Sequence, residues 1–209
     1  MRPVIFGWPV VLAAACVACS SDASLIEKVE AFRAARDAGR YDDARVYLAS
    51  DPRVWFESRD GEGTPMKDGA GPYKAWDEHF NSNGEQGPWT VDGRTVWAIA
   101  TESNDYYRLV ERDDTPTYRI TYFFNEDRLI EGYMISDAYP GQPSPPKVSR
   151  EDEFEAWAAA THADEWSYLR PDGKLDPTGD RAGRTRALLE LWRAAVGLPP
   201  IEPDVSADR

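Results

Sequence analysis

Three long runs of strand-forming residues, joined by short polar turns, are the feature that most constrains the fold of this chain. They occupy residues 95–110, 117–124 and 129–136, and the turns between them are the charged segments ERDDTP and NEDR. Aromatic and β-branched residues recur in these runs with the period of two that is typical of strands. An Asp92-Gly93 turn joins a shorter strand to the first run. Since short connections join antiparallel neighbours, the pattern predicts an antiparallel meander.

The segments before these strands have the spacing of helices. Apolar residues recur at helical intervals over residues 25–39, directly after a capping box that begins at Ser24. Shorter helices are predicted at residues 42–48 and 72–80, on either side of a strand at residues 53–58. Helices followed by a meander predict an α+β fold in which the N-terminal helices cover one face of the sheet.

A Pro-rich linker at residues 141–148 separates the strands from a helical C-terminus. Residues 150–169 and 181–197 each carry an apolar face, which predicts a pair of amphipathic helices packed against each other or on the sheet. The alternatives are that this pair binds a partner protein or covers the mouth of a pocket. The tail at residues 198–209 holds three prolines and is predicted to be extended or disordered.

This order of elements resembles the nuclear-transport-factor-2-like superfamily, which also holds ketosteroid isomerases and SnoaL-type polyketide cyclases. The resemblance covers about residues 25–139 and depends on the opening helix, the GRYDDARVYLASD step into the first strand, the helix around Trp76 and the final meander. It implies a strongly curved sheet that wraps the helices into a cone with an apolar pocket. Within the superfamily the chain looks most like secreted bacterial lipoprotein members with a helical C-terminal addition, and these imply no activity.

The N-terminus has the pattern of a bacterial lipoprotein signal. Arg2 precedes an apolar run at residues 4–18, which is too short to span a bilayer comfortably. Small residues lead into Cys16, as AAAC, and into Cys19, as CVAC, and both resemble the lipobox in which the cysteine is acylated. We favour lipidation at Cys19, because residues 20–24 are typical of a solvated tether. The alternative is a plain secretory signal with incidental cysteines.

An acylated cysteine would place the protein in the bacterial cell envelope, on the outer membrane facing the periplasm if the cell is Gram-negative. No cysteine follows Cys19, so the mature domain has no disulfide and no thiolate ligand of its own. Membrane attachment would come from the acyl chains alone. The expected divisions are a signal at 1–19, a tether at 20–24, a nuclear-transport-factor-2-like domain at 25–140, a linker at 141–148, a helical extension at 149–197 and a tail at 198–209.

The charge balance argues against one class of partner. Against 37 Asp and Glu the chain has 24 Lys and Arg, a net charge of −13, so a nucleic-acid partner is not expected. The sequence has no P-loop, GxGxxG, GxSxG, EF-hand or HExxH pattern, and we therefore expect no cofactor and no metal. Aromatic residues make up 12% of the chain, which suits large buried surfaces or a lined cavity.

Polar residues inside the first long strand are the most informative candidates for a site. Strand alternation over residues 102–107 would place Glu102, Asn104 and Tyr106 on one face and their neighbours on the other. Isomerase chemistry needs a carboxylate base and a tyrosine in an apolar pocket. Side chains suited to that chemistry, although they do not match the isomerase motif, are Asp105, Tyr107, Tyr122 and Asp137. The candidate ligand-binding residues are Trp76, His79, Trp97, Asn104 and Tyr106.

The sequence thus predicts a lipid-anchored envelope protein whose cone binds a small apolar ligand or another envelope protein without catalysis. The enzyme alternative is a cofactor-free isomerase or cyclase that uses an Asp/Tyr pair in the cone. A third alternative is a protein-interaction module formed by the C-terminal helices. A homodimer is compatible with each of these.

Overall fold

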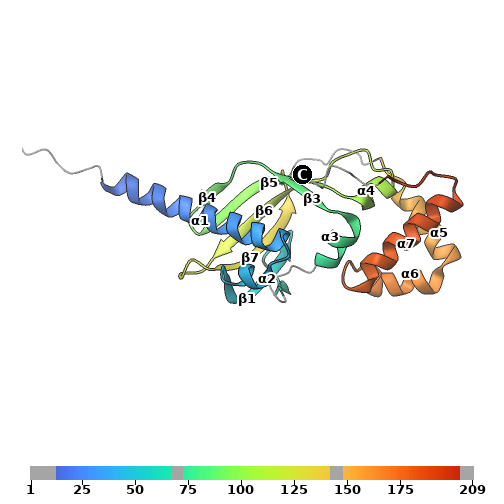
Figure 1. The fold of residues 1–209 in the computed structure, drawn as a ribbon, viewed down its shortest axis with the longest axis horizontal. Coiled ribbons are helices and arrows are strands. Elements are labelled where there is room, and N and C mark those ends of the chain that lie inside the picture. Colours follow the sequence, from blue (N-terminus) through green and yellow to red (C-terminus); the bar gives the residue numbers. More distant parts are fainter. Residues whose placement is uncertain (1–12, 67–72, 142–147, 203–209) are drawn as a thin grey trace, which may run out of the picture.

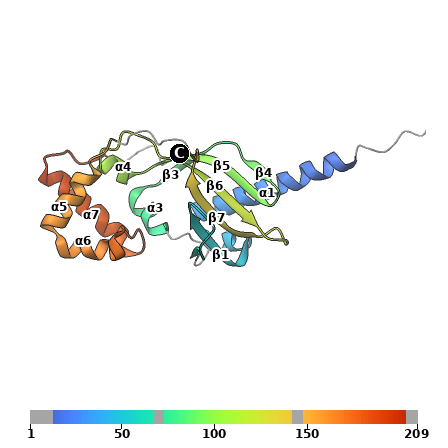
Figure 2. The ribbon, with the colours of Figure 1, turned by 180° about the vertical axis from the view of Figure 1, so that it is seen from behind.

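The computed structural model describes residues 13–66, 73–141 and 148–202, with side chains from residue 22 onward (Figure 1). Most of the predicted signal and most of the Pro-rich linker lie outside these ranges. Helix α1 (Ala13–Asp37) and the short helix α2 (Tyr41–Arg45) open the chain. A curved mixed sheet follows, and three more helices close the described chain at the end of the molecule away from the start of α1 (Figures 1 and 2). The predicted α+β class is confirmed.

The described residues form one seven-stranded sheet in the order β2-β1-β7-β6-β5-β3, with β4 also paired to β5. Strands β5, β6 and β7 form the predicted antiparallel meander, whereas β1 runs parallel to β7. The sequence did not predict this parallel pairing. The strand bounds are β1 (Leu48–Phe56), β2 (Thr64–Pro65), β3 (Asn83–Gln86), β4 (Thr90–Asp92), β5 (Thr95–Ser103), β6 (Thr117–Phe124) and β7 (Ile130–Asp137).

One face of the sheet is covered by α1. Along β6 the buried residues Ile120, Tyr122 and Phe124 alternate with residues that face outward, as the sequence period predicts. From α1, Val29 and Phe32 are both fully buried and pack into the same cluster. This cluster is the core of the cone.

Close approach of β1 and β7 requires a glycine at position 132. Gly132 has φ of +150°, and a Cβ there would lie 1.9 Å from the carbonyl oxygen of Arg53. The β6–β7 register also shifts between Phe123 and Phe124, opposite this position. The absence of a side chain therefore lets the parallel strand join the meander.

The prediction of one strand over residues 95–110 is wrong beyond Ser103. Asn104 caps a short helix, α4 (Asp105–Leu109), because its side-chain oxygen accepts a hydrogen bond from the backbone N–H of Tyr107 at 3.0 Å. The predicted alternation of residues 102–107 on two strand faces therefore does not exist. The edge strand β3 at Asn83–Gln86 was not predicted from the sequence.

The C-terminal extension has three helices, not the predicted pair. The helix predicted over residues 150–169 divides at His162 into α5 (Glu151–Thr161) and α6 (Ala163–Leu169), and α7 (Asp180–Ala195) follows. This bend lets Phe154 and Trp166 meet edge to face, with ring centroids 5.4 Å apart. Residues 198–202 of the tail have no helix or strand, and Leu198 and Ile201 pack against this extension.

The apolar faces of the extension are turned inward. Phe154, Leu189 and Trp192 are at most 1% exposed and share a second core cluster with Phe80 and Leu109 of the sheet domain. The extension is therefore joined to the sheet domain by a continuous apolar interface, and these faces are not available to another protein.

Helix α1 begins before the predicted capping box at Ser24. Its backbone is helical over residues 20–24, the predicted tether. No helix of the described residues has both the length and the apolar character of a membrane-spanning segment.

Candidate functional site

A cavity of about 740 Å³ lies between the inner face of the sheet and the helices. Its walls come from α1, from α3 (Lys74–Phe80) and from β5, β6 and β7, and Leu175 and Pro177 of the extension close one side. This volume is within the range of small-molecule sites. The lining residues that matter most below are Arg33, Arg36, Tyr73, Trp76, Asp77, Glu102, Tyr118 and Tyr133.

Two of the carboxylates that line the cavity, those of Asp77 and Glu102, come from different elements. Asp77 lies on α3, lines the cavity and is exposed to water there. Burial raises the pKa of Asp77 to about 6, with Arg36 opposing the rise and the charge of Glu102 adding to it. Glu102 shares the inner face of β5 with the buried Val96, Ala98 and Ala100. Burial raises the pKa of Glu102 as well.

Two tyrosine hydroxyls lie on the neighbouring strands. Tyr133 of β7 is 4% exposed and lines the cavity, yet within the described residues its hydroxyl has no hydrogen-bond partner. Burial raises the pKa of Tyr133, and burial raises that of Tyr118 to about 12. Both hydroxyls are therefore protonated at neutral pH and available as donors to a molecule in the cavity.

The cations of the wall are already engaged by the protein. Arg36 forms an ion pair with Asp37 at 3.0 Å, and Lys74 forms one with Glu78 at 3.6 Å. The Arg33 guanidinium lies 5.8 Å from the centroid of the Trp89 ring. Arg36 and Lys74 are thus paired with carboxylates and Arg33 contacts an aromatic ring, whereas Asp77 has no ion-pair partner within the described part of the chain.

Some of the residues predicted from the sequence do line this cavity. Trp76, Tyr106 and Tyr107 belong to its wall. The Tyr106 hydroxyl donates a hydrogen bond of 2.5 Å to Glu151 at the start of α5, which links the wall to the extension. Asn104 is buried and serves as the helix cap described above, and its Nδ2 donates to Glu102 at 2.8 Å.

Other predicted residues lie away from the cavity. Tyr122 is fully buried in the core, against Phe32 and Trp89. Trp97 lies on the outer face of the sheet, stacked with Arg119 at 3.9 Å. Asp137 is exposed at the end of β7.

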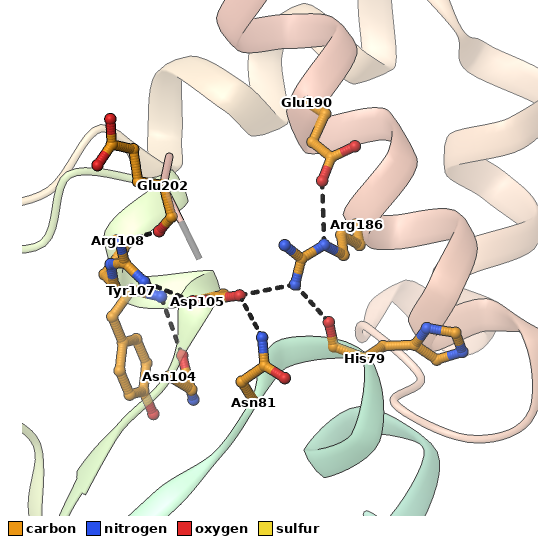
Figure 3. A network of polar contacts seen from close by, with 9 residues as sticks. All are labelled: His79, Asn81, Asn104, Asp105, Tyr107, Arg108, Arg186, Glu190 and Glu202. Carbon is orange, nitrogen blue, oxygen red and sulfur yellow. Dashed lines mark hydrogen bonds and ion pairs between the residues drawn. The ribbon is translucent and has the colours of Figure 1, made fainter. Parts of the chain in front are cut away.

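Asp105 and His79 belong to a buried polar network between α3, α4 and α7, shown in Figure 3. The Asp105 carboxylate, 2% exposed, accepts hydrogen bonds from Asn81 at 2.7 Å, Arg186 at 2.8 Å and Arg108 at 2.9 Å. Arg186 also donates to the carbonyl oxygen of His79 at 2.5 Å. We call these contacts of Asp105 the Asp105 network. All the contacts of its carboxylate are with protein donors, so it holds α7 against the sheet domain.

Sequence reasoning missed Asp77, Tyr118 and Tyr133 as site residues, and treated Glu102 only as part of a polar run. Tyr118 and Tyr133 followed the strand alternation and resembled core residues. Trp76 and Phe80, four residues apart, define the apolar face of this helix, and Asp77 lies beside that face. The sequence would have indicated Asp77 as a cavity residue only if the inward face of the helix were assumed to be wide.

No group of three or more potential metal ligands occurs in the part of the chain that the structure describes. The cavity therefore offers side chains suited to an organic molecule: aromatic rings, hydroxyl donors and two carboxylates.

Comparison with known proteins gives no family. No family model matches the chain, and no curated protein matches it. Among solved structures it is similar to a cystatin-fold protein from Novosphingobium aromaticivorans, at 15% identity over 53% of this chain and 96% of that one, with a TM-score of 0.41. A putative polyketide cyclase from Sinorhizobium meliloti has 16% identity over 52% and 93%, with a TM-score of 0.40. An NTF2-like protein from Cytophaga hutchinsonii has 13% identity over 53% and 87%, with a TM-score of 0.37. At these values the similarity carries no information about activity.

Proposed function

We propose that the cone binds a small organic molecule without converting it, in a protein held at the cell envelope by an acyl anchor on Cys19. The observation that carries the binding proposal is Tyr133, whose side chain is 4% exposed and lines the cavity, and whose hydroxyl no described residue hydrogen-bonds. A ligand or ordered water in the cavity can therefore accept a hydrogen bond from this hydroxyl. The aromatic wall would bury the rest of the molecule.

Native mass spectrometry of the mature protein, as purified and after incubation with a metabolite extract, tests binding. Gly84→Trp is the informative variant, because a Cβ at Gly84 meets only ordinary contacts, 3.6 Å from the Thr101 carbonyl oxygen and 3.7 Å from the Tyr118 hydroxyl. We expect the indole to fill the cavity and abolish retention of a small molecule. Gly84→Ala is the matched control and should keep it. Equal retention by Gly84→Trp would contradict the assignment of the site.

The acyl anchor is supported by the sequence around Cys16 and Cys19. Growth of a bacterial host with radiolabelled palmitate should label the protein, and Cys19→Ala should lose the label while Cys16→Ala keeps it. The reverse result would move the anchor to Cys16. Absence of label from the wild-type protein would leave a plain secretory signal as the better reading.

A specific observation also favours proton transfer as a second candidate function. Asp77 has a pKa raised to about 6, in the range of a general base at neutral pH, and it shares the cavity with the Tyr133 hydroxyl. In this version Asp77 would remove a proton beside a carbonyl while Tyr133 stabilises the enolate oxygen. Exchange of the α-hydrogens of 2-tetralone in D2O, followed by NMR, would then exceed the spontaneous rate and be lost in Asp77→Asn. If 2-tetralone exchanges only at the spontaneous rate, or if Asp77→Asn keeps the faster exchange, proton transfer by Asp77 is refuted for this probe.

A further inference from the structure

Resting on the binding function proposed above, we infer that the ligand carries a positively charged amine, held by Asp77 and Glu102 against the aromatic wall of the cavity. The class of ligand is a separate question from whether the cavity binds a molecule at all.

The two carboxylates are placed by elements that are fixed independently of each other. Asp77 lies on α3, and Glu102 lies on the inner face of β5, where it pairs in register with Gly84 of β3. Because Gly84 has no side chain, nothing from β3 covers Glu102 on that side. The neutral amide of Asn104 donates a hydrogen bond to Glu102 at 2.8 Å, and the Arg112 charge acts on Glu102 without forming an ion pair with it in the described chain.

The charge of the wall is unbalanced in favour of a cation. The positive groups Arg36 and Lys74 are paired with Asp37 and Glu78, and Arg33 is stacked on an indole. Asp77 and Glu102 have no such partner in the described chain. An anionic ligand would add a third negative charge beside them, whereas an ammonium group would supply the missing cation and up to three hydrogen-bond donors.

Tyr133 supplies a second and independent indication of a ligand. Its side chain is 4% exposed and lines the cavity, and no described residue hydrogen-bonds its hydroxyl. Tyr73 and Phe56, with rings 5.4 Å apart, add an aromatic edge at the wall. Aromatic faces attract ammonium groups, and this attraction is stronger where water is excluded.

The protonation state of Asp77 should make amine binding depend on pH. The groups that face Asp77 are Arg36 and Asp37 of α1, Glu102 of β5, Tyr118 and Tyr133 of the sheet, and Tyr73 beside α3. Burial holds the pKa of Asp77 at about 6, so near pH 6 the carboxyl is partly protonated. A bound cation lowers that pKa and expels the proton. Amine affinity should therefore rise from pH 5 to pH 7, and binding near pH 6 should release protons.

Three indole probes that differ in charge test the inference: tryptamine (cation), tryptophol (neutral) and indole-3-acetate (anion). Isothermal titration of the wild-type protein should show tryptamine binding roughly tenfold tighter than the other two, as expected for one charge-assisted contact. Titration at pH 6 in two buffers of different ionisation enthalpy should show proton release with tryptamine only.

The variants identify the carboxylates. Asp77→Asn and Glu102→Gln keep the side-chain shape, and each should remove most of the preference for tryptamine. The matched control is Glu85→Gln on β3, an exposed carboxylate next to Gly84 that is not among the lining residues of the cavity. It removes the same charge and should change tryptamine affinity by no more than about twofold.

The failures are distinguishable. Tighter binding of tryptophol or indole-3-acetate, or an unchanged preference in both Asp77→Asn and Glu102→Gln, overturns the amine inference and leaves the binding function intact. If no probe binds, the molecule that native mass spectrometry finds retained decides the amine inference. A retained cation supports it, and a retained neutral molecule or anion overturns it. If no probe binds and nothing is retained, both proposals fail.

Discussion

Loss of the Asp105 carboxylate should weaken the attachment of the extension to the sheet domain. Asp105→Asn keeps the size of the side chain but removes the negative charge. It also replaces one acceptor oxygen with an NH2 group that faces other donors. Asn81, Arg108 and Arg186 all donate to this carboxylate, so at least one of them loses its acceptor.

The magnitude follows from the burial of the three partners. Removing one member of a fully buried ion pair costs about 3–5 kcal/mol, because the remaining charge is left uncompensated. Here the carboxylate is 2% exposed, but Arg186 is 25% and Arg108 39% exposed, so water can recover part of their solvation. We therefore expect Asp105→Asn to lower the free energy of unfolding by about 2–3 kcal/mol.

Urea unfolding followed by tryptophan fluorescence measures this loss. A double-mutant cycle with Arg186→Gln should give a coupling energy of at least about 1 kcal/mol between the two residues. Arg184→Gln is the control on the same helix, because its pairing with Glu165 is at the surface and should not register in the same measurement. A coupling below about 0.5 kcal/mol, with native structure retained, would refute the claim that this ion pair holds α7 in place.

Three further predictions concern the sheet domain. Gly132→Ala should destabilise the protein by about 3 kcal/mol or more in urea unfolding, because its Cβ would lie 1.9 Å from the Arg53 carbonyl oxygen; a smaller loss would show that β1 and β7 can separate. Asn104→Ala should cost about 1 kcal/mol by the same assay through loss of the α4 cap, and no change would mean that the cap is dispensable. Between its ordinary pKa of 3.8 and about 6, Asp77 holds more proton in the native than in the unfolded state, so stability should fall as pH rises through this window. In the wild-type protein this decrease in the free energy of unfolding should be about 1 kcal/mol, because water in the cavity weakens the effect on the carboxyl. Asp77→Asn should abolish the decrease, and an unchanged pH profile in this variant would contradict the raised pKa.

The meander could be predicted because its signal is local. In β6 the alternation of residues 117–124 matches the observed strand and its buried face. The parallel pairing of β1 with β7 joins segments far apart in sequence and depends on the missing side chain of Gly132, which no local period reports. The end of β5 was detectable, since Asn104 before Asp105 is a typical helix N-terminus, but the apolar residues that follow outweighed it.

The candidate site was harder to predict because burial of a carboxylate does not reveal its role. Asp105 and Asp77 are both acids close to aromatic residues in the sequence, and only Asp105 was singled out. In the structure two arginines and an amide surround Asp105, all from helices or helix ends that meet only after folding. Asp77 lines a cavity instead.

The difference between these two acids indicates where a ligand would act. The buried carboxylate of Asp105 is already paired with two guanidinium groups. A ligand would have to displace these groups to reach it. Asp77 and Glu102 have raised pKa values because desolvation outweighs the opposing charges of Arg36 and Arg112, neither of which forms an ion pair with them in the described chain. A cation that enters the cavity would reduce the desolvation cost of these two carboxylates. The acids that stabilise the fold and the acids that can bind a ligand are therefore separated by whether the protein itself supplies their partners.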